Sequence, residues 1–416
     1  MILKAIYTTA ITAALPFLPL RLWWRGRSEP LYRRAMGERF GFYGEPIVQR
    51  VIWVHAVSLG ETRAAQPLIQ ALQRRFPEHR ILTTHMTATG RSAASGMYPD
   101  ALHAWLPYDH PWIVRRFLAH FRPRLGVVME TEVWPNLIAA CTRTSIPLLL
   151  ANARLSERSA RRYARVGSLA RKAFGGFAAI GAQTQVDANR IAMLGGRAPI
   201  VTGNIKFDVS APAHTSSAAT ALRTAFGGRN VFLAASTREG EEALLLEALK
   251  RRGLPDALVV IVPRHPQRFD AVADLIRSHG HALVRRSEGR SVPADCSFFL
   301  GDSMGELAAF YRACDVAFVG GSLVPKGGQN LIEACGAGVP VLIGPSQFNF
   351  AQAADQAIAA GAALRVASAD ALIAAADCLL SDRPARALMG QRAISFCAEH
   401  RGATARAIAI CERYIR

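Results

Sequence analysis

The sequence lacks the patterns that mark most metal, disulfide and dinucleotide sites. Its seven cysteines are scattered and form no Cys-x-x-Cys pair, which disfavours structural disulfides and a zinc site and fits a reducing compartment. His55, His85 and His265 have no second histidine at ligand spacing, so core or hydrogen-bonding roles are favoured over metal binding. The turn after the first predicted strand, SLGET, has no GxGxxG pattern, and we therefore expect no dinucleotide there.

Acidic residues are scarce in the first half of the chain. Residues 1–207 carry 28 Lys and Arg against 11 Asp and Glu, a net charge of +17, whereas the remainder carries 22 against 20, or +2. Because the second half is nearly neutral, a generally arginine-rich composition does not fully explain the excess. A basic half of this kind suits phospholipid, lipid phosphate or nucleic acid. Aromatic residues are not interleaved with the basic clusters, which disfavours nucleic acid.

Residues 1–30 are predicted to form a membrane anchor or interfacial segment. The run from Ala5 to Leu20 is uncharged, but two prolines interrupt it and it is short for a full bilayer span. Trp23 and Trp24, followed by basic residues, are typical of a membrane interface. The alternatives are a cleaved signal peptide, a spanning anchor and an amphipathic surface helix. Without a small-x-small cleavage pattern, we expect an anchor that keeps the protein on the cytoplasmic face, whether it spans the bilayer or lies on it.

The rest of the chain alternates short apolar runs with helical patterns, and its 416 residues can bury a large core. We predict an α/β protein of two Rossmann-like, doubly wound domains facing a central cleft: residues 31–207, a linker at 208–222, and 223–416 with C-terminal helices. A continuous helix is expected at about 61–76 and another at 156–173. Strands are predicted at 51–57, 81–85, 125–129, 147–151, 178–182, 199–201, 231–235, 258–262, 282–284, 298–300, 316–319 and 341–343.

Two glycine pairs follow the predicted strand 316–319. The second pair, Gly327 and Gly328, is expected to lead into a helix that opens near Gln329. Such turns let backbone N–H groups approach a phosphate at a helix N-terminus, although plain tight turns use the same residues. Glu333, one turn into that helix, could accept hydrogen bonds from ribose hydroxyls or could simply favour the helix dipole.

In parallel sheets ligands bind beyond the carboxyl ends of strands, where this sequence places several acids and bases. Glu61 is the best candidate for a general base; alternatively it is a helix N-terminal acid whose pKa the dipole lowers. Arg264 could hold a phosphate, or be an ordinary surface arginine. Lys206 could neutralise charge at the site, or be a solvated loop residue.

The segments HAVSLGE, METEVWPN, ANARLS, TGNIKFD, VPRHPQRF, DSMGEL, GGSLVPKGGQNLIEA and GPSQFNF occur in this order over almost the full length. Together they resemble the 3-deoxy-D-manno-octulosonic acid (Kdo) transferase family of lipopolysaccharide biosynthesis. The resemblance implies a GT-B glycosyltransferase on the cytoplasmic face of the inner membrane, with CMP-Kdo as donor and the lipid A precursor (lipid IVA) as acceptor. It also implies inversion at the anomeric carbon without a bound metal. We expect no cofactor, and the absence of a recognisable RNA or DNA module argues against a nucleic-acid partner.

The resemblance also assigns residues. It implies that Glu61 is the general base and that Glu130 and Lys206 support the transition state. The segments that match CMP-Kdo contacts contain Pro263, Arg264, Met304, Gly305, Glu306, Asn330, Leu331, Ile332 and Glu333. Secondary candidates at the strand ends and turns are Ser58, Gly60, Glu132, Ser236, Thr237, Gly327 and Gly328.

Two positions depart from the family pattern, because Arg238 and Gln329 stand where histidine is usual. The pair Ser346-Gln347 likewise replaces a histidine-containing pair. These departures put local donor contacts in doubt but leave the base unchanged. Another nucleotide-sugar enzyme, such as a UDP-sugar transferase or epimerase, and a non-enzymatic basic membrane-surface protein are the alternatives. The number of Kdo units transferred stays open.

Overall fold

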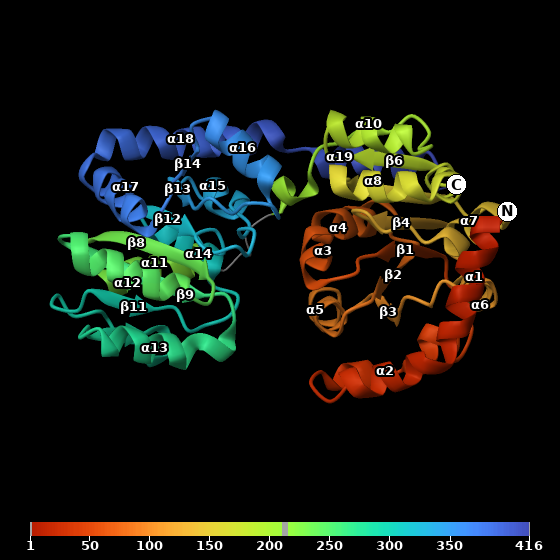
Figure 1. Cartoon of the computed structure of the whole chain (residues 1–416), viewed down its shortest axis with the longest axis horizontal. Helices are drawn as coiled ribbons and strands as arrows, with labels where there is room; N and C mark the ends of the chain where they lie inside the picture. The colour runs from red at the N-terminus through yellow and green to blue at the C-terminus, as the bar shows by residue number, and fades with distance from the viewer. Residues whose placement is uncertain (1, 210–214, 416) are drawn as a thin grey trace. The chain divides into compact units, whose positions relative to one another are not determined.

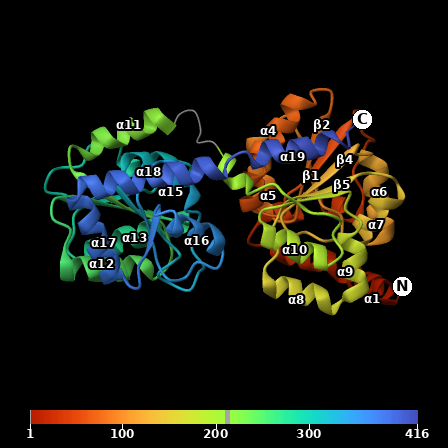
Figure 2. The same cartoon turned by 90° about the horizontal axis from the view of Figure 1, so that it is seen from above.

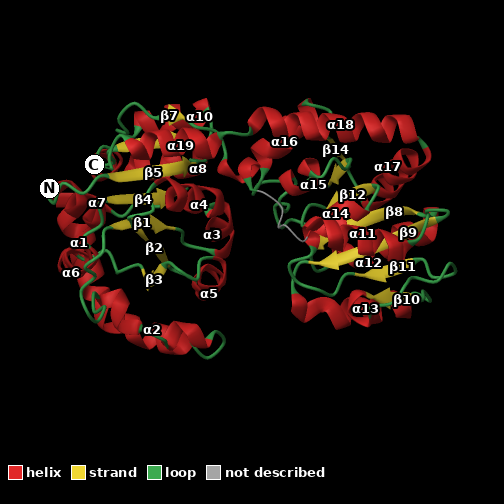
Figure 3. Ribbon diagram, turned by 180° about the vertical axis from the view of Figure 1, so that it is seen from behind, coloured by secondary structure: helices red, strands yellow, loops and turns green. Residues whose placement is uncertain are grey.

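The computed structural model describes residues 2–209 and 215–415. The chain divides into two compact units, Met1–Val209 with His400–Arg416, and Ser210–Glu399. Each unit is built on a seven-stranded sheet whose strand pairs are parallel, with helices on its faces (Figure 3). The predicted architecture of two Rossmann-like α/β domains is thereby confirmed.

The first sheet has the strand order β3-β2-β1-β4-β5-β6-β7. Alternate residues of β1 (Val51–His55) face opposite cores. Ile52 and Val54 pack with α4 (Gln66–Arg75) and α19 (Ala403–Glu412), whereas Val51 and Trp53 pack with α6 (Pro111–Phe121) and α7 (Pro135–Arg143). Burial on both faces explains why this strand is a continuous apolar run. The other strands are β2 (Arg80–His85), β3 (Leu102–Trp105), β4 (Leu125–Met129), β5 (Leu148–Ala153), β6 (Ala179–Ala182) and β7 (Ile200–Val201).

The helices between these strands begin at well-formed caps. The side chains of Ser58, Thr87 and Thr184 accept hydrogen bonds from backbone N–H groups in the first turns of α3 (Leu59–Ala64), α5 (Ala88–Met97) and α10 (Gln185–Met193). The helices of the body of this unit are α3 (Leu59–Ala64), α4 (Gln66–Arg75), α5 (Ala88–Met97), α6 (Pro111–Phe121), α7 (Pro135–Arg143), α8 (Glu157–Arg165), α9 (Gly167–Phe174), α10 (Gln185–Met193), the 3-10 turn η4 (Ile205–Asp208) and α19 (Ala403–Glu412).

The second sheet has the order β10-β11-β9-β8-β12-β13-β14. Phe232 and Ala234 of β8 (Asn230–Thr237) pack on one face against α12 (Glu241–Arg252), α13 (Phe269–Ser278) and α17 (Ala369–Ser381) (Figure 1). The strands are β8 (Asn230–Thr237), β9 (Ala257–Pro263), β10 (Leu283–Arg285), β11 (Phe298–Leu300), β12 (Val316–Val319), β13 (Val341–Ile343) and β14 (Ala363–Arg365). The helices are α11 (Thr215–Phe226), α12 (Glu241–Arg252), η5 (Pro266–Arg268), α13 (Phe269–Ser278), η6 (Arg286–Glu288), α14 (Leu307–Ala313), α15 (Ile332–Gly336), α16 (Ala351–Ala359), α17 (Ala369–Ser381) and α18 (Arg383–His400).

The N-terminal segment is helical but interrupted, as its prolines predict. Its elements are α1 (Ile2–Ala14), η1 (Leu15–Phe17), α2 (Leu18–Arg25), η2 (Pro30–Arg33) and η3 (Met36–Phe40). Ile2–Arg25 is the one stretch of the described residues long and apolar enough to cross a membrane. Trp24 and Phe17 are 66% and 70% exposed, so this segment presents a large apolar surface.

Several expected boundaries are wrong. The linker cannot extend to residue 222, because α11 begins at Thr215 and buries Leu222 and Phe226; its residues 210–214 lie outside the described residues. The chain end does not belong to the second domain, since α19 lies beside α4 in the first unit (Figure 2). There Ala407 and Ile410 join the core of the first sheet.

Two predicted helices are divided. The helix expected at 61–76 is interrupted at Ala65, and Pro67 stands in the first turn of α4, where its missing N–H is tolerated. The helix expected at 156–173 is divided at Val166. Strands β3 and β14 escaped prediction because they are edge strands with mixed burial, and neither forms a continuous apolar run.

Candidate functional site

The first sheet carries its polar residues where the strand order reverses, between β1 and β4. Glu61 follows β1, and Glu130 follows β4 directly. Lys206 comes from η4, after β7. Ligands of doubly wound sheets bind at this switch point, so the topology places these predicted residues at the expected edge.

Glu61 lies in the first turn of α3, capped by Ser58. Its Oε2 accepts a hydrogen bond of 2.6 Å from the Val57 amide, whereas its Oε1 lies 3.4 Å from the Ser58 hydroxyl. One carboxylate oxygen is thus fixed by the backbone, and the other has only a long contact with Ser58. The carboxylate therefore has a defined orientation and retains acceptor capacity.

The pKa of Glu61 is raised to about 7, first by burial and then by the negative charge of Glu130. The hydrogen bond from Val57 opposes this rise but does not cancel it. Glu61 does occupy the first turn of α3, as the alternative interpretation expected, but burial raises its pKa where the helix dipole alone was expected to lower it. Burial similarly raises the pKa of Glu132 to about 7. A carboxylate with a pKa near neutrality is suited to accept a proton from a hydroxyl.

Glu130 and Lys206 form an ion pair. The Lys206 Nζ lies 2.8 Å from Glu130 Oε1, and both side chains are about a fifth exposed. Glu130 has a φ of +57°, a left-handed conformation that is uncommon outside glycine, and such conformations are concentrated at functional sites. Asn204 supports the lysine, since its Oδ1 accepts from the Lys206 amide at 3.0 Å. The pair fixes a cation beside Glu130, whose negative charge in turn acts on Glu61.

In the second sheet the strand order reverses between β8 and β12. The turn after β12 is organised by Glu241, a fully buried residue that sequence reasoning missed. Its carboxylate accepts hydrogen bonds from the amides of Arg238, Gly321, Ser322 and Leu323, at 2.6 to 2.9 Å. Glu241 therefore joins the loops after β8 and β12.

The glycine pairs do not form the expected backbone cradle for a phosphate. Their N–H groups already donate within the unit: Gly320 to Ala235 O, Gly321 to Glu241, Gly327 to Ser346 Oγ and Gly328 to Gly321 O. The expected helix start near Gln329 is also wrong. Helix α15 begins only at Ile332 and has five residues. These glycines instead allow close packing, because a Cβ on Gly328 would lie 2.2 Å from Gln347 Oε1.

A neighbouring glycine provides a stability test. Gly344 follows β13, and a Cβ there would lie 2.4 Å from the backbone of Ser322. We expect Gly344→Ala to displace the turn held by Glu241 and to destabilise the second unit by about 3 kcal/mol. The matched control is Gly228→Ala, since nothing lies within 4 Å of a Cβ at that position. Urea unfolding of both variants tests this, and equal midpoints would contradict it.

Basic side chains lie beside the glycine turn after β12. Arg238 Nη1 lies 2.7 Å from His265 Nε2. A Cβ on Gly321 would lie 3.3 Å from Arg238 and 3.1 Å from Gln329, so the two departures from the family pattern meet at one turn. Burial lowers the pKa of His265, and the charges of Arg238 and Arg264 lower it further. Arg238 and Arg264 therefore place positive charge near His265 at this edge, where guanidinium groups could bind an anion.

The remaining residues predicted to contact CMP-Kdo differ in their exposure to solvent. Asn330 Nδ2 donates to Glu333 Oε1 at 3.1 Å, and Glu333 is exposed. Leu331 and Ile332 are buried, so only their backbone could reach a ligand. Pro263 ends β9, and the Arg264 amide donates to Thr237 O. Met304 and Gly305 are exposed on a loop, and Glu306 pairs with Arg286 at 2.9 Å. These contacts of Asn330, Glu306 and the Arg264 amide are therefore with different partners, and they do not join the predicted donor residues into one cluster.

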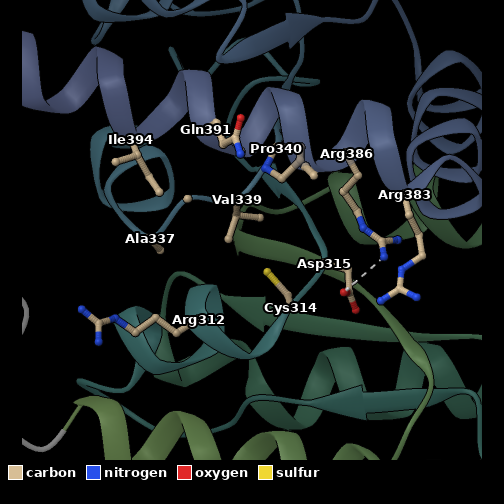
Figure 4. Close-up of a pocket in the computed structure, with 13 residues that line it drawn as sticks. Arg312, Cys314, Asp315, Ala337, Val339, Pro340, Arg383, Arg386, Gln391 and Ile394 are labelled. Atoms are coloured by element: carbon tan, nitrogen blue, oxygen red, sulfur yellow. Dashed lines mark ion pairs between the residues drawn. The ribbon is translucent and has the colours of Figure 1, made fainter.

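The second unit also has a cavity of about 430 Å³ at the opposite, amino edge of its sheet (Figure 4). Asp315 and Pro340, which precede β12 and β13, line it together with the start of α18. Asp315 is 2.9 Å from Arg223 and 3.9 Å from Arg386, so its charge is matched within the unit. None of the described residues that line this cavity was predicted to contact CMP-Kdo. The candidate site is therefore the carboxyl edge of the sheet.

Comparison with known proteins agrees with this arrangement. The family model described as 3-deoxy-D-manno-octulosonic-acid transferase (kdotransferase) matches residues 34–209, and that for glycosyl transferases group 1 matches residues 231–396. The 3-deoxy-D-manno-octulosonic acid transferase of Bordetella pertussis is 43% identical over 435 residues, and that of Haemophilus influenzae is 36% identical over 423 residues. Both alignments cover 99% of each chain.

A solved structure of UDP-GlcNAc 2-epimerase from Neisseria meningitidis aligns with 88% of this chain and 100% of its own, at 16% identity and a TM-score of 0.59. That likeness shows the fold alone. Two parallel α/β units with polar residues at their switch points, matched by glycosyltransferase families, define a glycosyltransferase of the GT-B fold. The chain belongs to the 3-deoxy-D-manno-octulosonic-acid (Kdo) transferase family, as the similarity over its full length shows.

Proposed function

We propose that this protein transfers Kdo from CMP-Kdo to the lipid A precursor lipid IVA in lipopolysaccharide biosynthesis, with inversion and without a metal ion. The observation that carries the proposal is the oriented Glu61 carboxylate, with a pKa of about 7, beside the Glu130–Lys206 pair. Glu61 is the proposed general base. A base of this pKa is largely ionised at slightly alkaline pH and still binds a proton strongly.

In the proposed reaction the acceptor hydroxyl gives its proton to Glu61 while its oxygen attacks the anomeric carbon of Kdo. The bond from that carbon to the CMP phosphate oxygen breaks, and CMP leaves with the electron pair. One displacement inverts the anomeric centre. Lys206 and Glu130 hold charge near the developing oxocarbenium ion, and preorganised charges of this kind stabilise transition states.

The second unit is proposed to bind the nucleotide. Arg238 and Arg264 would offset the charge of the leaving phosphate, since guanidinium groups match phosphate oxygens. Glu333, exposed at the start of α15, would accept hydrogen bonds from the ribose. In this proposal the arginine side chains, rather than the glycine backbone amides expected from the sequence, stabilise the negative charge of the leaving phosphate.

The membrane is the proposed location of the reaction. The apolar Ile2–Arg25 stretch and the net charge of +17 on residues 1–207 suit an anionic bilayer and a phosphorylated lipid acceptor. We propose the cytoplasmic face of the inner membrane. Purified protein with lipid IVA should turn over CMP-Kdo and leave UDP-sugars unused. Turnover of a UDP-sugar alone would overturn the proposal, and mass spectrometry of the lipid product would count the Kdo units added.

The pH dependence tests the base. A base must be ionised, so the rate should fall as the pH drops through about 7, the pKa of Glu61. Because the charge of Glu130 raises that pKa, Glu130→Gln should move the acidic limb of the kcat profile to lower pH while reducing the maximum rate. Glu157→Gln is the control, since Glu157 is an exposed acid of α8. An unmoved limb in Glu130→Gln contradicts the assignment.

A further inference from the structure

The apolar N-terminal helix α1 is fastened to the first unit by hydrogen bonds, near α6 and α7 (Figure 1). The Tyr7 hydroxyl donates to Asp109 Oδ2 at 2.9 Å, and Asn136 Nδ2 lies 3.2 Å from the Thr8 hydroxyl. Asp109 and Asn136 are almost fully buried, at 3% and 2% exposed. The helix that composition marks as a membrane segment therefore has one side bound to the protein body.

Asp109 also holds the start of α7. Its Oδ2 accepts from the Asn136 amide at 3.0 Å, and its Oδ1 accepts from the Leu137 amide at 2.7 Å. Its backbone oxygen accepts from Asn136 Nδ2 at 2.7 Å. These bonds satisfy amides in the first turn of the helix, which otherwise lack partners within it. Asp109 thus fixes where and in which direction α7 begins.

The start of α7 closes the loop that carries two acids of the candidate site. Strand β4 ends at Met129 and α7 begins at Pro135, so Glu130 and Glu132 lie on the short connection between a fixed strand and a fixed helix. A short loop has little freedom once both of its ends are held. A shift of α7 must therefore move these carboxylates relative to Glu61.

The chain after α2 is fastened at the same edge. Arg39 is 2% exposed, its Nη2 donates to Met86 O at 3.0 Å, and its guanidinium lies 4.0 Å from the centre of the Trp105 ring. Glu38 pairs with Arg91 at 2.7 Å and accepts from the Trp105 amide at 2.8 Å. The N-terminal segment thus contacts Met86 after β2, Trp105 at the end of β3, Asp109 after β3 and Asn136 in the first turn of α7.

We infer that Tyr7, Asp109 and Asn136 are positioning residues that connect the membrane-facing helix α1 to the Glu130–Glu132 loop. The inference rests on the proposed roles of Glu61 and Glu130. The N-terminal helix is then part of the acceptor-side machinery as well as an anchor, and its docking sets the geometry in which the base and its neighbouring charges act.

The test is Tyr7→Phe, which removes one hydroxyl and leaves the apolar surface of α1 almost unchanged. We expect kcat for Kdo transfer on vesicle-bound protein to fall about tenfold, because small displacements of catalytic groups are costly, while KM for CMP-Kdo stays unchanged. Thr8→Val should lower kcat in the same direction. The control is Thr12→Val, whose hydroxyl bonds only within α1, to Thr8 O.

Thermal unfolding and vesicle sedimentation accompany the kinetics and show that the variants are folded and membrane-bound. A normal kcat in both Tyr7→Phe and Thr8→Val overturns the inference, as does a loss that is explained by release from vesicles. Glu61→Gln separates this inference from the proposed function. An active Glu61→Gln refutes the base whatever the α1 variants show. An inactive Glu61→Gln with a normal kcat in both Tyr7→Phe and Thr8→Val refutes the positioning role alone.

Discussion

Replacing Glu61 with alanine is expected to reduce Kdo transfer by at least about 10³-fold, near the upper range for loss of a general base. The acceptor hydroxyl would then have to lose its proton without the carboxylate that the Val57 amide orients. Donor binding should survive, because Glu61 lies on the first unit and the proposed nucleotide contacts lie on the second. The change is therefore predicted in kcat rather than in affinity for CMP-Kdo.

Single-turnover transfer to lipid IVA measures the rate, and calorimetry measures CMP binding. Glu61→Gln keeps the shape of the side chain and should be almost as inactive, since an amide cannot take the proton. Glu157→Ala is the matched control, because this acid is exposed in the same unit and pairs only locally with Arg161. A Glu61→Gln variant with near-normal turnover would falsify the assignment of the base.

The sequence predicted much of the fold because parallel sheets bury both faces of a strand. The runs at Leu125–Met129, Val316–Val319 and Val341–Ile343 are continuous and apolar, and they appear as strands with those bounds. Edge strands such as Ala363–Arg365 have exposed residues, and so they lack this signal. The position of α19 could not be read from local pattern, since its partners α4, β6 and η4 lie about 200 residues or more away in the chain.

The site was predictable in position but not in its interactions. Strand ends placed Glu61, Glu130 and Lys206 at one edge, as topology requires. Spacing could not show that burial outweighs the helix dipole at Glu61, because solvent exposure depends on tertiary packing. It also could not show that the glycine amides have internal partners. Two adjacent acids, Glu241 and Glu242, follow Gly240 and could have marked this position in the sequence. Solvated acids are common at helix starts, however, so this pattern alone does not indicate a buried carboxylate.

Glu241→Ala is the second change with a large expected effect. It removes the hydrogen-bond acceptor of four backbone amides, those of Arg238, Gly321, Ser322 and Leu323. Glu241 is fully buried, so water does not replace its carboxylate readily. Unsatisfied buried donors and the cavity left behind should destabilise the second unit by about 3–5 kcal/mol. The turn beside Arg238 and Gln329 should lose its conformation, and CMP binding should be lost with it.

The neighbouring exposed acid supplies the control, since Glu239→Ala changes the same net charge without removing these bonds. Denaturant unfolding followed by calorimetry with CMP compares the two variants. A Glu241→Ala protein that keeps normal stability and nucleotide affinity would show that the turn after β12 is held by other contacts. If stability falls but CMP still binds with normal affinity at low temperature, the carboxylate stabilises the unit without shaping the nucleotide site. If the Glu241 carboxylate bridges the loops after β8 and β12, Glu241→Ala should lose both stability and CMP affinity, whereas Glu239→Ala should keep both.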